Sequence, residues 1–307
     1  MKHASTEPSL SARAATAASL EARLARFPAR RVAAGARVTG YREAVGDAVG
    51  ATAGDALPLV LLHGIGSGAA SWVQQLESLG ASRRVLAWDA PGYGESTPVD
   101  AASPLAADYA AALAAWLDAL NIERCVLIGH SLGAIVAGAF AAANAARVAG
   151  LLLISPAAGY GAASPDLRAS KRDARLAMLA ELGPAGLAAQ RSTNMLSAHA
   201  DEAARAWVRW NMARIVPAGY AQATHLLANA DLAADLAALD GRIDVEVAVG
   251  EDDRITPPAA CERLAAAART TLRVVPRAGH AGYVEAPADY DAMIAAFCRS
   301  IEAQRSS

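Results

Sequence analysis

Residues 125–133, with the sequence CVLIGHSLG, decide how this chain folds. Their first four side chains form a short apolar run of the kind found in strands that are buried on both faces. Residues 134–146 are rich in alanine and lack proline, which predicts a helix. Between the two, Gly129 and Gly133 flank Ser131 and remove Cβ atoms where strand, turn and helix would collide. Ser131 is therefore a candidate nucleophile on a strand-to-helix turn.

Short apolar runs alternate with helical segments along the rest of the chain, which predicts a parallel sheet with helices on both faces. The runs are residues 59–62, 85–88, 125–128, 151–154, 245–249 and 272–275. Before them, Val32 falls in one short stretch and Val38 and Tyr41 in another, with glycines between and after, which indicates an antiparallel pair at the sheet edge. The predicted fold class is α/β, with a mostly parallel, eight-stranded sheet.

The alternation is interrupted between residues 156 and 244, where helical segments are separated by Pro184 and Pro217. A structureless loop of that length is implausible in a compact domain, so we predict a helical cap or lid over residues 156–244. The α/β core would then comprise residues 27–155 and 245–307. Residues 1–26 are predicted to be a partly disordered extension with a short helix near its end, and residues 46–55 to be a loop.

The composition limits the possible functions. The 307 residues are 54% hydrophobic with a net charge of −2, which permits a large core and gives no electrostatic reason to bind nucleic acid or an anionic membrane. Cys125, Cys261 and Cys298 are too widely spaced for a disulfide framework or a metal cluster, so we expect reduced core residues. No signal-peptide core or membrane-length apolar span is found, and the expectation is a cytoplasmic protein.

A serine nucleophile needs a base, and histidine is the natural one near neutral pH. His280 follows the last predicted strand, at the carboxyl edge where open parallel sheets carry their sites. The other five histidines are less suitable: His3 in the extension, His63 and His130 in other motifs, and His199 and His225 in the predicted lid. We therefore expect His280 to act as the base.

The acid that orients this histidine is expected on another loop at the same edge. The stretch GEDDRITP at residues 250–257 follows the predicted strand 245–249 and offers Glu251, Asp252 and Asp253. Only one of the three can point inward, and their spacing does not choose among them.

Two backbone amides are needed to stabilise a tetrahedral oxyanion. The amide of Leu132 follows the nucleophile at a helix start, where N–H groups are unpaired. The glycine-rich stretch HGIGSG at residues 63–68 follows a predicted strand and could present the amide of Ile65. This stretch lacks the GK[ST] ending of a P-loop and the GxGxxG spacing of a dinucleotide site, which argues against a nucleotide ligand.

These motifs together resemble the α/β-hydrolase superfamily over roughly residues 31–303. The matching stretches are residues 63–64 with Trp72 downstream, 88–96 (WDAPGYGES), 129–133, 250–257 (G-x-x-D-x-I-x-P) and 279–280 (GH). The resemblance implies the α/β-hydrolase fold and the chain order serine, acid, histidine. It carries the acid role onto Asp253, and it gives Asp89 and His63 structural roles beside the oxyanion loop.

Within the superfamily, the stretches HGIGSGAASW and GEDDR look like hydrolases that cleave carbon–carbon bonds in aromatic ring-fission products. The chain departs from those enzymes at His130 and Ala281, where GHSLG and GHAGY are more typical of ester, lactone and thioester hydrolases. Our leading hypothesis is a serine hydrolase of a small-molecule carboxylic ester, with an acyl-serine intermediate and no metal or organic cofactor. The alternatives are carbon–carbon bond hydrolysis of a 2-hydroxy-6-oxo-dienoate and a ligand receptor with this fold.

The predicted lid would set the choice of substrate. The candidate wall residues are Trp72, Leu132, Met195, Trp207, Trp210, Met212 and Tyr283. Arg168, Arg175 and Arg191 could bind a substrate carboxylate, although a solvated helix face also explains them. We expect a small-molecule substrate and no nucleic-acid or membrane partner, and the sequence leaves a homodimer open.

Overall fold

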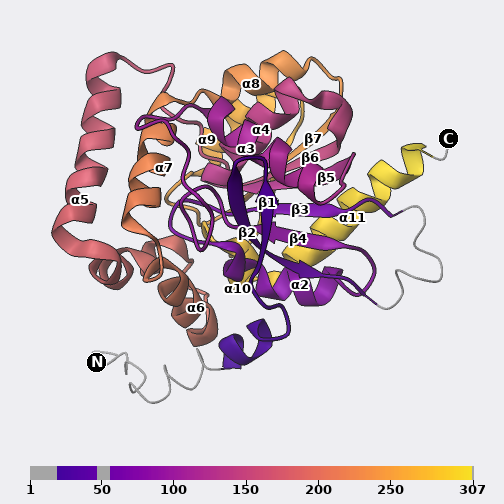
Figure 1. Cartoon of the computed structure of the whole chain (residues 1–307), viewed down its shortest axis with the longest axis horizontal. Coiled ribbons are helices and arrows are strands. Elements are labelled where there is room, and N and C mark those ends of the chain that lie inside the picture. The colour runs from indigo at the N-terminus through magenta and orange to yellow at the C-terminus, as the bar shows by residue number, and fades with distance from the viewer. Residues whose placement is uncertain (1–18, 47–55, 306–307) are drawn as a thin grey trace.

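The computed structural model of the chain describes residues 19–46 and 56–305 and contains an eight-stranded sheet (Figure 1). The strands lie in the order β1-β2-β4-β3-β5-β6-β7-β8. Their bounds are β1 Arg30–Ala34, β2 Arg37–Ala44, β3 Leu59–Leu62, β4 Val85–Trp88, β5 Cys125–His130, β6 Val148–Ile154, β7 Asp244–Gly250 and β8 Leu272–Val275. The pairs β1–β2 and β2–β4 are antiparallel and the others are parallel, so the predicted fold class is confirmed.

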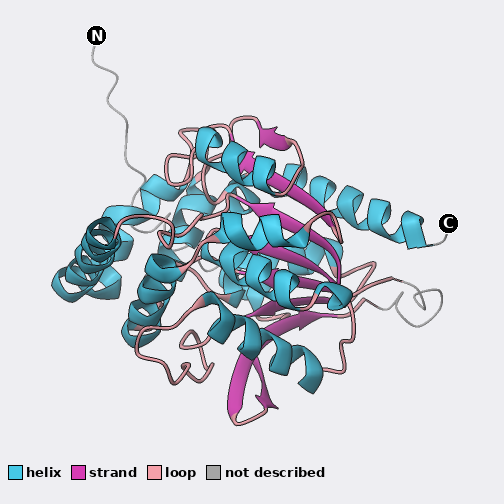
Figure 2. Cartoon of the chain, turned by 90° about the horizontal axis from the view of Figure 1, so that it is seen from above, coloured by secondary structure: helices cyan, strands magenta, loops and turns pink. Residues whose placement is uncertain are grey.

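Helices cover both faces of this sheet (Figure 2). Those of the α/β layers are η2 Ala69–Trp72, α2 Val73–Leu79, α3 Ala106–Ala119, α4 Leu132–Ala143, η3 Ala145–Arg147, α9 Pro258–Ala267, α10 Gly282–Glu285 and α11 Pro287–Arg305. Successive strand side chains point to opposite faces, and the apolar runs therefore supply two separate cores. Val60 and Leu62 pack in one core with α3, α4 and α9, while Leu59 and Leu61 pack in the other with α2 and α11.

The segment between β6 and β7 is helical, as its sequence indicates. It contains α5 Pro165–Arg191, η4 Ser192–Met195, α6 Glu202–Met212, α7 Pro217–Asn229 and α8 Leu232–Leu239. Helices α5, α6 and α7 lie together at one side of the sheet (Figure 1), whereas α8 packs against α4 and α9. The boundaries of a lid at residues 156 and 244 stay a prediction.

The N-terminal segment is helical from residue 19 to residue 24, and the turn after it ends before Pro28. Leu20, Leu24 and Phe27 are buried in the core that contains α2 and α11. The disorder predicted for the first residues, and nearly all of the loop predicted at residues 46–55, fall outside the described residues. None of the described helices has both the length and the apolar character needed to cross a membrane.

Candidate active site

Ser131 lies on a strained turn between β5 and α4, with φ 54° and ψ −113°. A Cβ at Gly129 would come within 2.6 Å of the Ala134 backbone, and one at Gly133 within 2.3 Å of the Leu62 carbonyl oxygen. The two flanking glycines are therefore required by close backbone approach. The Ser131 side chain makes no capping hydrogen bond to α4, so its hydroxyl is not used by the helix. Backbone strain of this kind is typical of functional sites.

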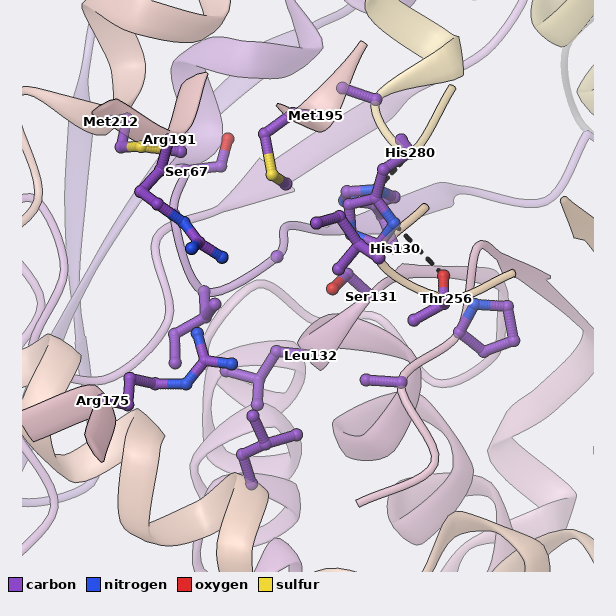
Figure 3. Close-up of a pocket in the computed structure, with 18 of the residues that line it drawn as sticks. Ser67, His130, Ser131, Leu132, Arg175, Arg191, Met195, Met212, Thr256 and His280 are labelled. Atoms are coloured by element: carbon purple, nitrogen blue, oxygen red, sulfur yellow. Dashed lines mark hydrogen bonds between the residues drawn. The ribbon is translucent and has the colours of Figure 1, made fainter. Parts of the chain in front are cut away.

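The hydroxyl of Ser131 borders a cavity of about 490 Å³ at the carboxyl ends of the parallel strands. His130, Leu132, Thr256 and His280 also line this cavity, and helices α5, α6 and α7 supply its opposite wall (Figure 3). A cavity at this edge of a parallel sheet is the usual place for a ligand.

Asp253 and His280 form a hydrogen-bonded pair beside this cavity. The distance from His280 Nδ1 to Asp253 Oδ2 is 2.9 Å, and both side chains are fully buried. The other carboxylate oxygen, Oδ1, accepts hydrogen bonds from the amides of Ile255 at 2.8 Å and Thr256 at 2.9 Å. Burial raises the pKa of Asp253, but the charge and hydrogen bond of His280 and the Thr256 amide outweigh it and lower that pKa to about 2. The carboxylate is therefore ionised at neutral pH.

An ionised carboxylate can only accept hydrogen bonds, so the proton on the His280 ring lies on Nδ1. The opposite atom, Nε2, is then the basic nitrogen, and it is buried without a hydrogen-bond partner among the described residues. The structure does not join Ser131 Oγ to this nitrogen by a hydrogen bond. Such contacts are often long in unliganded enzymes, and rotation of the serine side chain changes the distance.

The two other carboxylates of the loop point elsewhere. Glu251 accepts a hydrogen bond from the Arg277 amide at 3.1 Å, and Asp252 is part-exposed with its carboxylate 3.9 Å from His199 Nε2. Sequence reasoning missed Thr256, whose hydroxyl donates to Asp253 Oδ2 at 2.8 Å and lies 3.2 Å from His280 Nδ1. Its place three residues after the acid was the available signal.

The amides proposed for the oxyanion both lack hydrogen-bond partners among the described residues. Leu132 is the first residue of α4, where the helix leaves its N–H groups free. The carbonyl of Gly64 accepts hydrogen bonds from Ser67 N at 3.1 Å and His63 Nδ1 at 2.8 Å. A trans peptide points its N–H opposite to its carbonyl, so these bonds orient the N–H of Ile65 away from them.

His63 has a defined tautomer that supports this loop. The Ala90 amide donates to His63 Nε2 at 3.0 Å, which leaves the proton on Nδ1 for the Gly64 carbonyl. Burial lowers the pKa of His63, and the ring is therefore neutral. Asp89 accepts a hydrogen bond from the Ala69 amide at 2.8 Å. Both side chains thus hold backbone next to the glycine-rich loop.

His130 links the Ser131 turn to the His280 loop. Its Nε2 lies 2.9 Å from the His280 carbonyl oxygen, and its ring lies 4.8 Å from the rings of both His280 and Tyr283. Burial, followed by the nearby His280, lowers the pKa of His130 to about 3. The neutral ring therefore donates from Nε2 to the carbonyl, and it cannot serve as a cation for the substrate.

Four of the predicted wall residues line the cavity: Leu132, Met195, Met212 and Tyr283. Their contact with a substrate stays a prediction. Arg175 and Arg191 also line the cavity, whereas Arg168 does not and instead contacts Asn229 at 3.4 Å.

Trp72, Trp207 and Trp210, the three candidate tryptophans, are not among the described residues that line this cavity. Trp72 is fully buried behind Tyr283, with the two rings stacked 4.0 Å apart. Trp207 is also fully buried, and it stacks at 4.5 Å on Trp210, whose indole faces the N-terminal helix through a hydrogen bond to Glu21. Their large apolar rings are used in packing between layers. No group of three His, Cys, Asp or Glu side chains suited to a metal ion occurs within the described residues.

Comparisons with known proteins identify the family and its relatives. The sequence profile described as "Alpha/beta hydrolase family" matches residues 59–292. RutD of Variovorax paradoxus (strain S110), provisionally named a carbamate hydrolase, is 31% identical over 261 residues, covering 81% of this chain and 94% of RutD. A 2-hydroxy-6-oxononadienedioate/2-hydroxy-6-oxononatrienedioate hydrolase of Pseudomonas putida is 42% identical over 111 residues, which are 35% of this chain and 38% of that protein. A solved structure of a thermophilic esterase from Thermogutta terrifontis, with malate bound, has a TM-score of 0.76 and 25% identity over 90% of this chain and 99% of the esterase.

Proposed function

The chain belongs to the alpha/beta hydrolase family, and from this premise we propose that it hydrolyses a small-molecule carboxylic ester, lactone or thioester through an acyl-serine intermediate. One observation carries the proposal. The strained Ser131 turn and the unpartnered Nε2 of His280 border the same cavity, and His280 is held in the basic tautomer by the ionised Asp253. This is the arrangement that a serine nucleophile needs.

The first half of the reaction forms the acyl-serine. Ser131 Oγ attacks the ester carbonyl carbon, and its proton passes to His280 Nε2. Asp253 stabilises the imidazolium that results. The negative charge that develops on the carbonyl oxygen is stabilised by the amides of Leu132 and Ile65, each worth about 3 kcal/mol. His280 then gives its proton to the leaving oxygen, and the carbon–oxygen bond breaks.

The second half regenerates the serine. A water molecule takes the place of the leaving alcohol, His280 Nε2 removes its proton, and the hydroxide attacks the acyl carbon. The tetrahedral intermediate collapses, the carboxylic acid leaves, and Ser131 recovers its proton from His280. These steps use only side chains and amides of this chain.

Carbon–carbon bond hydrolysis is a second candidate, favoured by the local 42% identity to the Pseudomonas putida hydrolase. The same three side chains would act on a ketone after the dienol substrate takes up a proton on carbon. A coloured 2-hydroxy-6-oxo-dienoate, followed by its ultraviolet-visible absorbance, separates the two reactions. Consumption of the dienoate much faster than that of short esters would favour this candidate.

The direct test is Ser131→Ala, assayed with p-nitrophenyl butyrate and compared with Ser170→Ala, which changes an exposed serine on α5. We expect a loss of kcat of at least roughly 10⁴-fold for Ser131→Ala and none for the control. Equal melting temperatures would show that both variants are folded. Retained turnover in folded Ser131→Ala contradicts the proposal.

A receptor with this fold would instead show slow turnover and a protein complex that forms only with ligand bound.

A further inference from the structure

The charged side chains that line the cavity are all cationic. They are Lys171, Arg175, Arg191 and Arg263, and no aspartate or glutamate is among the lining residues that the structure describes. The chain as a whole has a net charge of −2. This local excess of positive charge is therefore not a consequence of composition, and it gives the cavity an electrostatic preference for anions.

Two of these cations come from the two halves of one kinked helix. Helix α5 is interrupted at Gly183, which has φ 60° and is followed by Pro184. Arg175 precedes the kink and Arg191 ends the helix after it. Figure 3 shows both guanidinium groups extending into the cavity on the same side, across from Ser131. The kink thus brings together two charges that are far apart along the helix.

Neither guanidinium has a carboxylate partner among the described residues. Arg175 is half-buried, and its contact is the Tyr220 hydroxyl at 3.3 Å. On the same helix, Arg172 does not line the cavity and pairs with Asp173 at 2.7 Å. Partial burial of a cation without an acidic partner costs free energy, and an anion that binds beside the cation reduces this cost. Guanidinium groups suit carboxylates because their N–H donors are paired.

We propose that the substrate carries a carboxylate on its acyl part and that Arg175 and Arg191 bind it. This inference rests on the proposed function. The leaving group must lie next to His280 Nε2, because that atom returns the proton. The acyl part then extends away from His280, towards the side on which the two arginines lie (Figure 3). The corresponding substrate class is a half-ester, thioester or lactone of a short dicarboxylic acid.

A matched pair of esters tests this inference. p-Nitrophenyl hydrogen glutarate and p-nitrophenyl pentanoate have acyl chains of the same length and differ by the terminal carboxylate. We expect the wild-type kcat/KM to be at least roughly tenfold higher for the glutarate ester. In Arg175→Gln the ratio of the two kcat/KM values falls roughly 10- to 100-fold, with a smaller fall in Arg191→Gln because Arg191 is exposed and better screened. Arg172→Gln, the matched control on α5, leaves the ratio unchanged.

Failure of this inference differs from failure of the proposed function. If both esters are hydrolysed at similar rates and Arg175→Gln leaves their ratio unchanged, the carboxylate site is refuted while the serine hydrolase proposal stands. If neither ester is hydrolysed, the melting temperature with added glutarate tests binding instead. A rise in the melting temperature of the wild type, without a rise in that of Arg175→Gln, supports the carboxylate site. Glutarate without effect on either protein overturns it.

Discussion

Replacement of Asp253 by asparagine should inactivate the protein by moving one proton. The backbone amides of Ile255 and Thr256 both donate to Asp253 Oδ1, so the asparagine must keep its carbonyl oxygen at that position. Its amino group then faces His280 Nδ1 and the Thr256 hydroxyl, where Oδ2 was. An amino group only donates, and His280 Nδ1 must therefore accept. The ring proton moves to Nε2, the atom that has to receive the proton of Ser131.

The expected loss is large because the wrong tautomer removes the base altogether. In serine proteases, exchange of the triad aspartate for asparagine produces the same wrong histidine tautomer and lowers kcat by roughly 10⁴-fold. This factor is about 5.5 kcal/mol of activation free energy. We expect a similar loss of kcat for Asp253→Asn with p-nitrophenyl butyrate. KM should change much less, since Asp253 does not line the cavity.

Asp252→Asn is the matched control, because it makes the same chemical change one residue away on a part-exposed side chain. Its kcat should stay within about twofold of the wild type. A folded Asp253→Asn variant with kcat within tenfold of the wild type would refute the tautomer argument and the role given to Asp253. Circular dichroism and the melting temperature of each variant establish whether it is folded.

Two further predictions concern the oxyanion loop and acid stability. His63→Ala removes one of the two donors to the Gly64 carbonyl and the acceptor of the Ala90 amide. We expect a kcat roughly 10- to 100-fold lower and an unfolding free energy about 3 kcal/mol lower, measured by steady-state kinetics and urea unfolding. Exposed His199→Ala should leave both quantities unchanged, and a wild-type kcat in His63→Ala would contradict the prediction. The pKa of Asp253 falls from 3.8 to about 2 on folding, so its stabilising contribution of roughly 2 kcal/mol is complete above pH 4 and is lost as pH falls to 2. Urea unfolding from pH 5 to pH 2 should show this loss of unfolding free energy in the wild type and a smaller loss in Asp253→Asn. An equal dependence of unfolding free energy on pH in the two proteins would contradict the prediction.

The sheet and the serine turn could be predicted because their signals are local. Residues 59–62 are apolar at every position, and the structure buries all four completely. The glycines around Ser131 reflect close backbone contacts within this strand, turn and helix, and together with the flanking apolar run and alanine-rich segment they indicate the turn. Asp253 was chosen through resemblance, since three adjacent carboxylates carry no signal of which one faces His280.

The cavity wall was harder to predict because it depends on contacts distant in the sequence. Trp207 lies on an apolar helix face, but the sequence does not say whether that face covers the cavity or another layer. The same difficulty applies to Arg175 and Arg191, which are brought together by the kink at Gly183. The sequence indicated each arginine as a candidate, and only the three-dimensional arrangement distinguishes them from Arg168.

The acyl-serine intermediate is the central claim, and intact-protein mass spectrometry tests it most directly. The wild type is mixed with p-nitrophenyl butyrate, quenched in acid within milliseconds and weighed, and the modified peptide is then sequenced. We predict a transient mass increase of one butyryl group that maps to Ser131 and is absent from Ser131→Ala. A butyryl group on another residue, or turnover with no acylated species under conditions where deacylation limits the rate, would contradict the account.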